Sequence, residues 1–299
     1  MNTPPLAPQM PVAAEIPTSR LIFWSIKREF WENRSLYFVP LAVAVLFLAG
    51  SLIGLMHSSV HVHAGMSVHG EAVQVHSMVA LAIMGATLLV TMFYCIDALY
   101  SERRDRSVLF WKSLPVSDLT TVLAKATIPI LIMPLLMFAV TVFTQAALLL
   151  FGSVSTLARG QSVAALWSNL HFFQSSYILF FHLLAIHGLW YAPIYCWLLM
   201  VSAFAPRAPI TWAVLPPFAV ILLEKIAFHT SYLGNLLAYR FFGSPPREAP
   251  FIGPPMDMDS LTLADVGRFF IDPGLWAGFV AAAAFLALAV WLRRSREAI

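Results

Sequence analysis

The sequence predicts an all-α polytopic membrane protein, and three features carry that prediction. The 299-residue chain is 60% hydrophobic and only 11% charged, and its mean hydropathy is +0.78. Apolar runs recur along the chain with about the ~20 residues that are needed to cross a hydrocarbon layer. Lysine and arginine collect between alternate runs, as they do in cytoplasmic loops. A soluble protein of this length could not bury so much apolar surface.

The N-terminal region is predicted to reach the membrane gradually. Residues 1–17 are rich in proline and alanine and carry a single charge, Glu15, so we expect a disordered cytoplasmic tail. Residues 18–34 mix aromatic side chains with basic and acidic ones. That mixture is typical of a helix that lies in the plane of the membrane interface.

Six membrane-spanning helices are predicted after this interfacial helix. They cover residues 36–56, 77–96, 119–151, 172–204, 208–228 and 274–292. The third is longer than a membrane requires, and Pro129 and Pro134 are expected to kink it. The fifth is expected to be interrupted at Pro216-Pro217. With an even number of spans, the basic residues near both ends of the chain lie on one side of the membrane. We therefore expect cytoplasmic N- and C-termini in a bacterial-type cytoplasmic membrane.

Two connecting segments are long enough to have structure of their own. Residues 224–273 form an extended outside segment, in which residues 232–242 are expected to be an amphipathic helix. Residues 97–118 form a cytoplasmic loop with the densest block of charge in the chain, which is too costly to place in the bilayer core.

The charged loop is predicted to begin as a short amphipathic helix. Its exposed face is expected to hold Glu102, Arg103, Asp105 and Arg106. Its apolar face is expected to hold Val108, Leu109, Phe110 and Trp111. Leu114-Pro115 should end this helix, and Ser117 is placed to cap the next one.

The pattern Glu102…Arg106-Ser107…Trp111-Lys112-Ser113-Leu114-Pro115-Val116-Ser117 resembles the loop between spans two and three of ABC-2-type transporter permeases. In that family this loop carries the coupling helix that sits on the ATPase. The run Lys27-Arg28-Glu29-Phe30-Trp31-Glu32 likewise resembles the elbow helix that precedes the first span. The resemblance implies ATPase coupling by Glu102, Arg103, Arg104, Asp105, Arg106, Trp111, Lys112, Leu114 and Pro115. It implies elbow-helix roles for Lys27, Arg28, Glu29 and Trp31.

This resemblance implies the permease subunit of an ATP-driven exporter. The substrate would be a lipid, a peptide or a hydrophobic drug. The partners would be a second permease copy, as a homodimer or with a close homologue, and two separate ATPase subunits that bind ATP and Mg²⁺. The chain has no glycine-rich lysine motif for nucleotide, so we expect no enzymatic activity and no cofactor in the chain itself. No basic run indicates nucleic acid.

Histidines offer a function of another class. His57, His61, His63, His69 and His76 fall within or beside one predicted outside loop. Imidazoles bind zinc or copper and titrate near neutral pH, so the alternative is a membrane scaffold or a metal or pH sensor that acts through the His57–His76 loop. Solvated histidines that bind no metal are the simpler interpretation. Within span four, His182 and His187 are expected to form interhelical hydrogen bonds, with a substrate contact as the alternative.

Overall fold

The computed structural model describes residues 17–57, 68–107, 116–158, 160, 162–170, 172–242 and 269–295. Every regular element in these ranges is helical. Six of the described helices are long and apolar enough to cross a membrane: Ser35–Gly54, Gln74–Arg104, Asp118–Ala158, Leu166–Trp190, Pro209–Phe228 and Pro273–Ser295. The chain is therefore a multi-pass helical membrane protein, as its composition predicts.

The elements follow one another with short connections. The first half contains α1 (Thr18–Glu32), α2 (Ser35–His57), α3 (Val68–Asp97), α4 (Tyr100–Arg104), α6 (Asp118–Thr127), η1 (Ile128–Ile132), α7 (Met133–Ala158) and α8 (Ala164–Leu170). The second half contains α9 (Phe172–His182), η2 (Leu183–Trp190), α10 (Ala192–Phe204), α11 (Pro209–Leu223), η3 (Glu224–Phe228), α12 (Tyr232–Phe242) and α14 (Pro273–Ser295). The η elements are π-helices, in which the turn is wider than in an α-helix.

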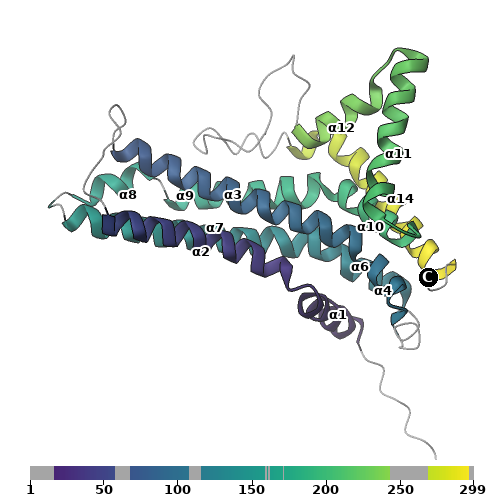
Figure 1. Cartoon of the computed structure of the whole chain (residues 1–299), viewed down its shortest axis with the longest axis horizontal. Coiled ribbons are helices and arrows are strands. Elements are labelled where there is room, and N and C mark those ends of the chain that lie inside the picture. The colour runs from purple at the N-terminus through teal and green to yellow at the C-terminus, as the bar shows by residue number, and fades with distance from the viewer. Residues whose placement is uncertain are drawn as a thin grey trace, which may run out of the picture.

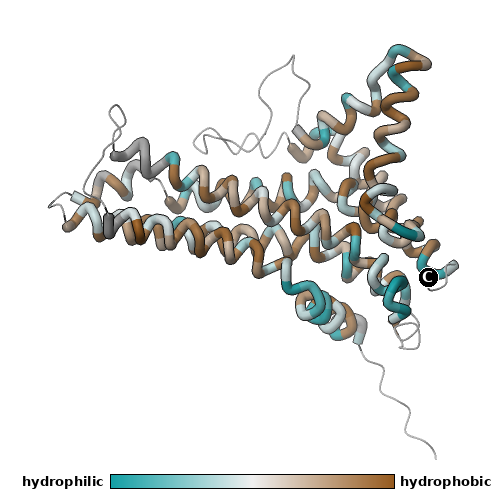
Figure 2. The backbone as a smooth tube through the Cα atoms, in the orientation of Figure 1, coloured by the Kyte–Doolittle hydropathy of each residue, from teal (hydrophilic) through white to brown (hydrophobic). Residues whose placement is uncertain are grey.

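The spans form an elongated bundle in which α2, α3 and α7 pack along one another. Figure 1 places α1, α4, α6 and the C-terminal end of α14 at one end of this bundle, and α8 at the other. Hydrophilic residues gather at the end that holds α1 and α4 (Figure 2). In contrast, α11 diverges from the bundle (Figure 1), and of its residues only Ala213 is buried.

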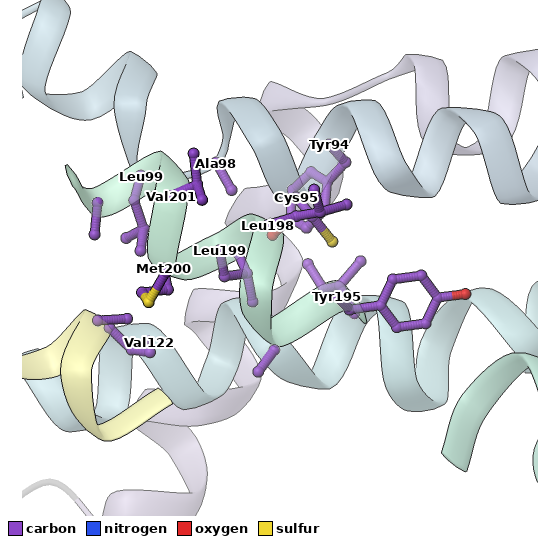
Figure 3. Packing of buried hydrophobic residues seen from close by; sticks show 14 of the residues in the cluster. Tyr94, Cys95, Ala98, Leu99, Val122, Tyr195, Leu198, Leu199, Met200 and Val201 are labelled. Atoms are coloured by element: carbon purple, nitrogen blue, oxygen red, sulfur yellow. The ribbon is translucent and has the colours of Figure 1, made fainter. Parts of the chain in front are cut away.

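The largest buried cluster joins the ends of α3 and α10 to α6 and α14, close to the charged end of the bundle. Figure 3 shows Tyr94, Cys95 and Leu99 packed against Tyr195 and Leu199. Cys95 and Cys196 are both buried and are not joined in a disulfide, which agrees with their positions inside apolar runs. This core fixes α4 and α6 relative to the spans.

A proline and a glycine bring the two longest helical segments into close contact. Pro134 has no backbone N–H, so the carbonyl of Ile130 lacks its normal partner one turn later. The wide turn of η1 lies here, between α6 and α7. Gly188 in η2 packs against that carbonyl, and a Cβ at this position would lie only 2.5 Å from the oxygen. The irregular backbone therefore lies at the prolines that predicted it.

Three sequence predictions about the spans are wrong in detail. The second span begins at Val68, well before residue 77, so His69 and His76 lie on a helix and not in a loop. The predicted fourth span is divided at Tyr191 into η2 and α10. The predicted break at Pro216-Pro217 is absent, because α11 continues through both prolines. In hydrocarbon, leaving the helix would free still more backbone groups.

The connecting segments agree with prediction where they are described. The expected helix over residues 232–242 is confirmed as α12. The helix predicted over residues 18–34 is confirmed as α1, which ends at Glu32. The expected tail of residues 1–16, and residues 243–268 of the outside segment, lie outside the described residues.

Candidate functional site

The charged segment between the second and third spans is only partly exposed. Arg104, Asp105 and Arg106 face outward, as predicted. Glu102 and Arg103 are buried, with relative exposures of 5% and 6%. The prediction that these two side chains form an exposed charged face is therefore wrong. Both are buried because they find charged or hydrogen-bonding partners inside the bundle, which periodicity alone does not reveal.

The predicted amphipathic helix is also shorter at its start than expected. Helix α4 ends at Arg104, and Arg106 has a φ of 58°, in the left-handed region that interrupts a helix. Residues 108–115 lie outside the described residues, and with them Trp111, Lys112, Leu114 and Pro115. The predicted cap is confirmed, since the Ser117 hydroxyl accepts a hydrogen bond from the Thr120 N–H at 3.1 Å.

Glu102 is the centre of a buried charge network that joins four helices. Its Oε1 lies 3.1 Å from Nζ of Lys125 in α6 and 3.2 Å from Nη2 of Arg28 in α1. Its Oε2 lies 2.5 Å from Nη1 of Arg293 in α14. The Nε of Arg293 in turn donates to Asp118 at the start of α6, at 2.9 Å.

Glu29 in α1 is the second carboxylate of this network and is 1% exposed. Its Oε1 accepts hydrogen bonds from Lys125 at 2.7 Å and from Arg28 at 2.8 Å. Its Oε2 accepts one from the Tyr94 hydroxyl in α3, at 3.0 Å. The ammonium of Lys125 therefore lies between two carboxylates that come from different ends of the N-terminal half.

The buried charge network is balanced: Arg28, Lys125 and Arg293 face Glu29, Glu102 and Asp118. Burial opposes the charge of the Arg28 guanidinium, but hydrogen bonding and attraction from Glu29, with smaller contributions from Glu102 and Glu32, raise its pKa above the ordinary value. Removing one partner from such a network leaves a buried charge uncompensated. The arrangement thus fixes the positions of α1, α4, α6 and α14 relative to one another.

Arg103 forms a separate clamp between α4 and the end of α10. Its Nη2 donates to the carbonyl of Ser202 at 2.9 Å and to that of Ala205 at 2.7 Å. The Ser202 hydroxyl accepts from the backbone N–H groups of Leu99 and Tyr100 at 2.9 and 2.8 Å. Carbonyls at a helix C-terminus have no intrahelical partner, so this arginine satisfies α10 while holding α4 in place.

The remaining residues of α1 face outward. The Lys27 ammonium lies 4.8 Å from the ring centre of Trp24 and 4.9 Å from that of Trp31. Both rings are exposed. This face combines aromatic area with a cation, which suits contact with lipid headgroups. Of the residues assigned to the elbow helix, Arg28 and Glu29 instead point into the buried charge network.

The histidines form no metal site in the described part of the chain, where no group of three His, Cys, Asp or Glu residues is placed to hold an ion. His61 and His63 lie outside the described residues. His76 and Gln145 join α3 to α7 through side-chain contacts to each other's backbone carbonyls. The His182 and His187 rings are 5.8 Å apart. Nδ1 of His187 has no hydrogen-bond partner in the described ranges, so the predicted interhelical bond is not found at that atom.

Comparison with known protein families, curated proteins and solved structures finds no match. The evidence on function is therefore the geometry of the chain itself. Sequence reasoning did not assign Tyr94, Asp118, Lys125 or Arg293 to a site. A signal was present for Lys125, because a lysine followed by a long apolar run needs an anionic partner in the bundle.

Proposed function

We propose that this chain is the membrane-spanning permease subunit of an ATP-driven transporter of the ABC-2 type. The observation that carries the proposal is the buried charge network, which ties α1 and α4 to α6 and α14. A permease needs a rigid connection between the surface on which the ATPase acts and the helices that enclose the substrate path. A balanced set of buried ion pairs supplies such a connection, because none of its members can move alone without losing a partner.

In this proposal the docking surface begins at the exposed end of α4. Arg104, Asp105 and Arg106 offer both signs of charge to solvent, and charge at the rim of an interface orients the partner. The segment that follows, up to Pro115, would complete the surface with Trp111 and Lys112. Glu102 and Arg103 belong to the mechanical connection and not to the docking surface, which changes the roles that the family resemblance implies for them.

The same proposal assigns the remaining parts of the chain. Helix α1 acts as the elbow helix, with Trp24, Lys27 and Trp31 at the headgroup layer. The end of the bundle with α1 and α4 is cytoplasmic, in a bacterial-type inner membrane. ATP and Mg²⁺ bind to a separate ATPase, two copies of which serve a pair of permease chains. The transported molecule is an amphiphile, in keeping with the apolar surface that α11 exposes along its length.

The test is purification of the tagged chain from its native membrane, followed by identification of proteins with ATPase activity that accompany it. We expect an ATPase whose turnover is stimulated by amphiphiles only when the chain is present. The matched variant exchanges the exposed pair, Arg104→Asp with Asp105→Arg, which keeps net charge and spares the buried charge network. It should insert normally but bind less ATPase.

Charge reversal at the exposed Arg207, which lies after α10, is the control and should have a smaller effect. Purification of the intact chain without any ATPase would contradict the transporter proposal. That result would favour the alternative, a scaffold or sensor without transport. Unchanged ATPase binding in the exchanged variant would refute the placement of the docking surface at the end of α4.

A further inference from the structure

Arg240 is a charged residue buried in an apolar part of the bundle. It lies on α12 and is 7% exposed. Its guanidinium carbon lies 4.3 Å from the ring centre of Trp190 in η2, and the Trp190 indole N–H donates to the Arg240 carbonyl at 2.9 Å. The buried side chains at the same junction are Ile186, Phe269 and Leu275.

The opposite wall of this site is a glycine. At Gly278 in α14, a Cβ would lie 1.5 Å from Nη2 of Arg240. The guanidinium therefore occupies the space that any other residue at 278 would fill. Residue 278 and Trp190 together hold the planar group between a helix backbone and an aromatic ring, an environment that arginine tolerates better than lysine.

The guanidinium has no carboxylate partner in the described part of the chain. Asp272 is close in sequence to α14, but its oxygens accept hydrogen bonds from the Tyr239 hydroxyl at 2.6 Å and from the Gly274 N–H at 2.7 Å. The Nη1 of Arg240 is buried and has no hydrogen-bond partner in the described ranges. A buried guanidinium with unused donors indicates a missing anion, because an unpaired charge is costly in such a setting.

The position along α14 places this site at membrane depth. Gly278 precedes Arg293 of the buried charge network by fifteen residues, which is about 22 Å along a helix. A hydrocarbon layer is about 30 Å thick. If Arg293 marks one membrane surface, Arg240 lies within the hydrocarbon layer, nearer to the opposite surface. An ionisable residue at such a depth is a candidate binding group.

We infer that Arg240 binds the anionic headgroup, a phosphate or a carboxylate, of a membrane amphiphile whose chains lie along the neighbouring apolar side chains. The forked guanidinium suits two oxygens of one anion. In the assembled transporter this amphiphile is either a resident lipid or the transported molecule, and the latter assignment rests on the proposed function. Binding of the headgroup does not, since it is measured on the permease chain alone.

The experiment measures binding of phosphatidic acid to the purified, delipidated chain by native mass spectrometry, with diacylglycerol as the matched ligand without phosphate. We expect phosphatidic acid to bind and diacylglycerol to bind much more weakly. Arg240→Gln should weaken phosphatidic acid binding by about tenfold or more, as expected for loss of a charge-assisted pair. Gly278→Ala should weaken it too, since the new methyl displaces the guanidinium while the charge remains.

Gly50→Ala is the control, because a Cβ there meets no atom within 4 Å, and it should bind like the parent protein. Binding that is equal for the two ligands, or unchanged in both Arg240→Gln and Gly278→Ala, would overturn the inference. Gly278→Ala keeps the arginine, so a folding defect in Arg240→Gln does not remove the test. In the assembled complex, phosphatidic acid that stimulates ATPase activity through Arg240 is a transported molecule, and bound phosphatidic acid without stimulation is a resident lipid.

Discussion

The ammonium of Lys125 in α6 lies 2.7 Å from a carboxylate oxygen of Glu29 in α1, and both side chains are almost completely buried. Lys125→Met should therefore leave the buried charge network with one uncompensated negative charge. We expect a loss of about 3–5 kcal/mol in the free energy of unfolding, the usual cost of breaking a buried ion pair. Titration of the purified protein with a denaturing detergent, followed by circular dichroism, measures it.

The double variant Lys125→Met with Glu29→Gln restores the charge balance and should lose less stability than the sum of the two single variants. Additive losses would contradict the network. The exchange of Glu102 with Arg106 is unsuitable as a test of docking, because Glu102 is buried. Its effect on folding would obscure any effect on a partner.

The arginine clamp at the end of α10 gives a second prediction. Arg103→Met removes the donors for two carbonyls, those of Ser202 and Ala205, and should destabilise the protein by about 1.5–3 kcal/mol, the range for hydrogen bonds to a charged group. Arg104→Met removes an exposed cation one residue later and should leave thermal stability unchanged. Equal thermal stability of the two variants would show that the clamp contributes nothing.

The contact between Gly188 and Ile130 gives a third prediction. Gly188→Ala places a methyl group against a backbone oxygen that cannot rotate away, so η1 and η2 must separate. We expect a loss of about 1–3 kcal/mol, as for overpacked cores. Gly85→Ala, where a Cβ meets no atom within 4 Å, should not destabilise the protein. Thermal unfolding of both variants makes the comparison, and a stable Gly188→Ala protein would contradict the close packing.

Orientation gives a fourth prediction, which follows from the distribution of basic residues. In a variant with Cys95→Ala and Cys196→Ala, a cysteine replacing the exposed Ser162 should react with an impermeant thiol reagent in intact cells. A cysteine replacing Ser295, at the end of α14, should react only after the membrane is permeabilised. Labelling of Ser295→Cys from outside would invert the topology and remove the cytoplasmic docking surface.

Apolar composition and length were enough to predict the all-α class and the positions of six spans, because a bilayer requires both in the sequence itself. They also located α12 and the Ser117 cap. Local patterns failed where a residue's environment is set by distant parts of the chain. Glu102 has the periodicity of an exposed side chain, yet it is buried because Arg293 reaches it from 191 residues away.

The candidate site was predicted in location but not in composition. The sequence indicated the segment around residues 102–106 and the charged stretch of α1. Pairing between them depends on Lys125, whose side chain lies between the two carboxylates. No motif joins Arg28, Glu102 and Lys125, because their separations along the chain follow from the lengths of the spans and not from any local chemistry.

The order of synthesis gives the buried charge network a further consequence. Ribosomes make α1, α4 and α6 long before α14, and domains assemble as the chain emerges. Until α14 arrives, Glu29, Glu102 and Asp118 outnumber Arg28 and Lys125, and the surplus charge keeps the end of the bundle open to water. Arg293 then closes it. A nascent chain that stalls before α14 would expose this unbalanced acidic surface, a signal by which membrane quality-control proteases could distinguish it from the finished protein.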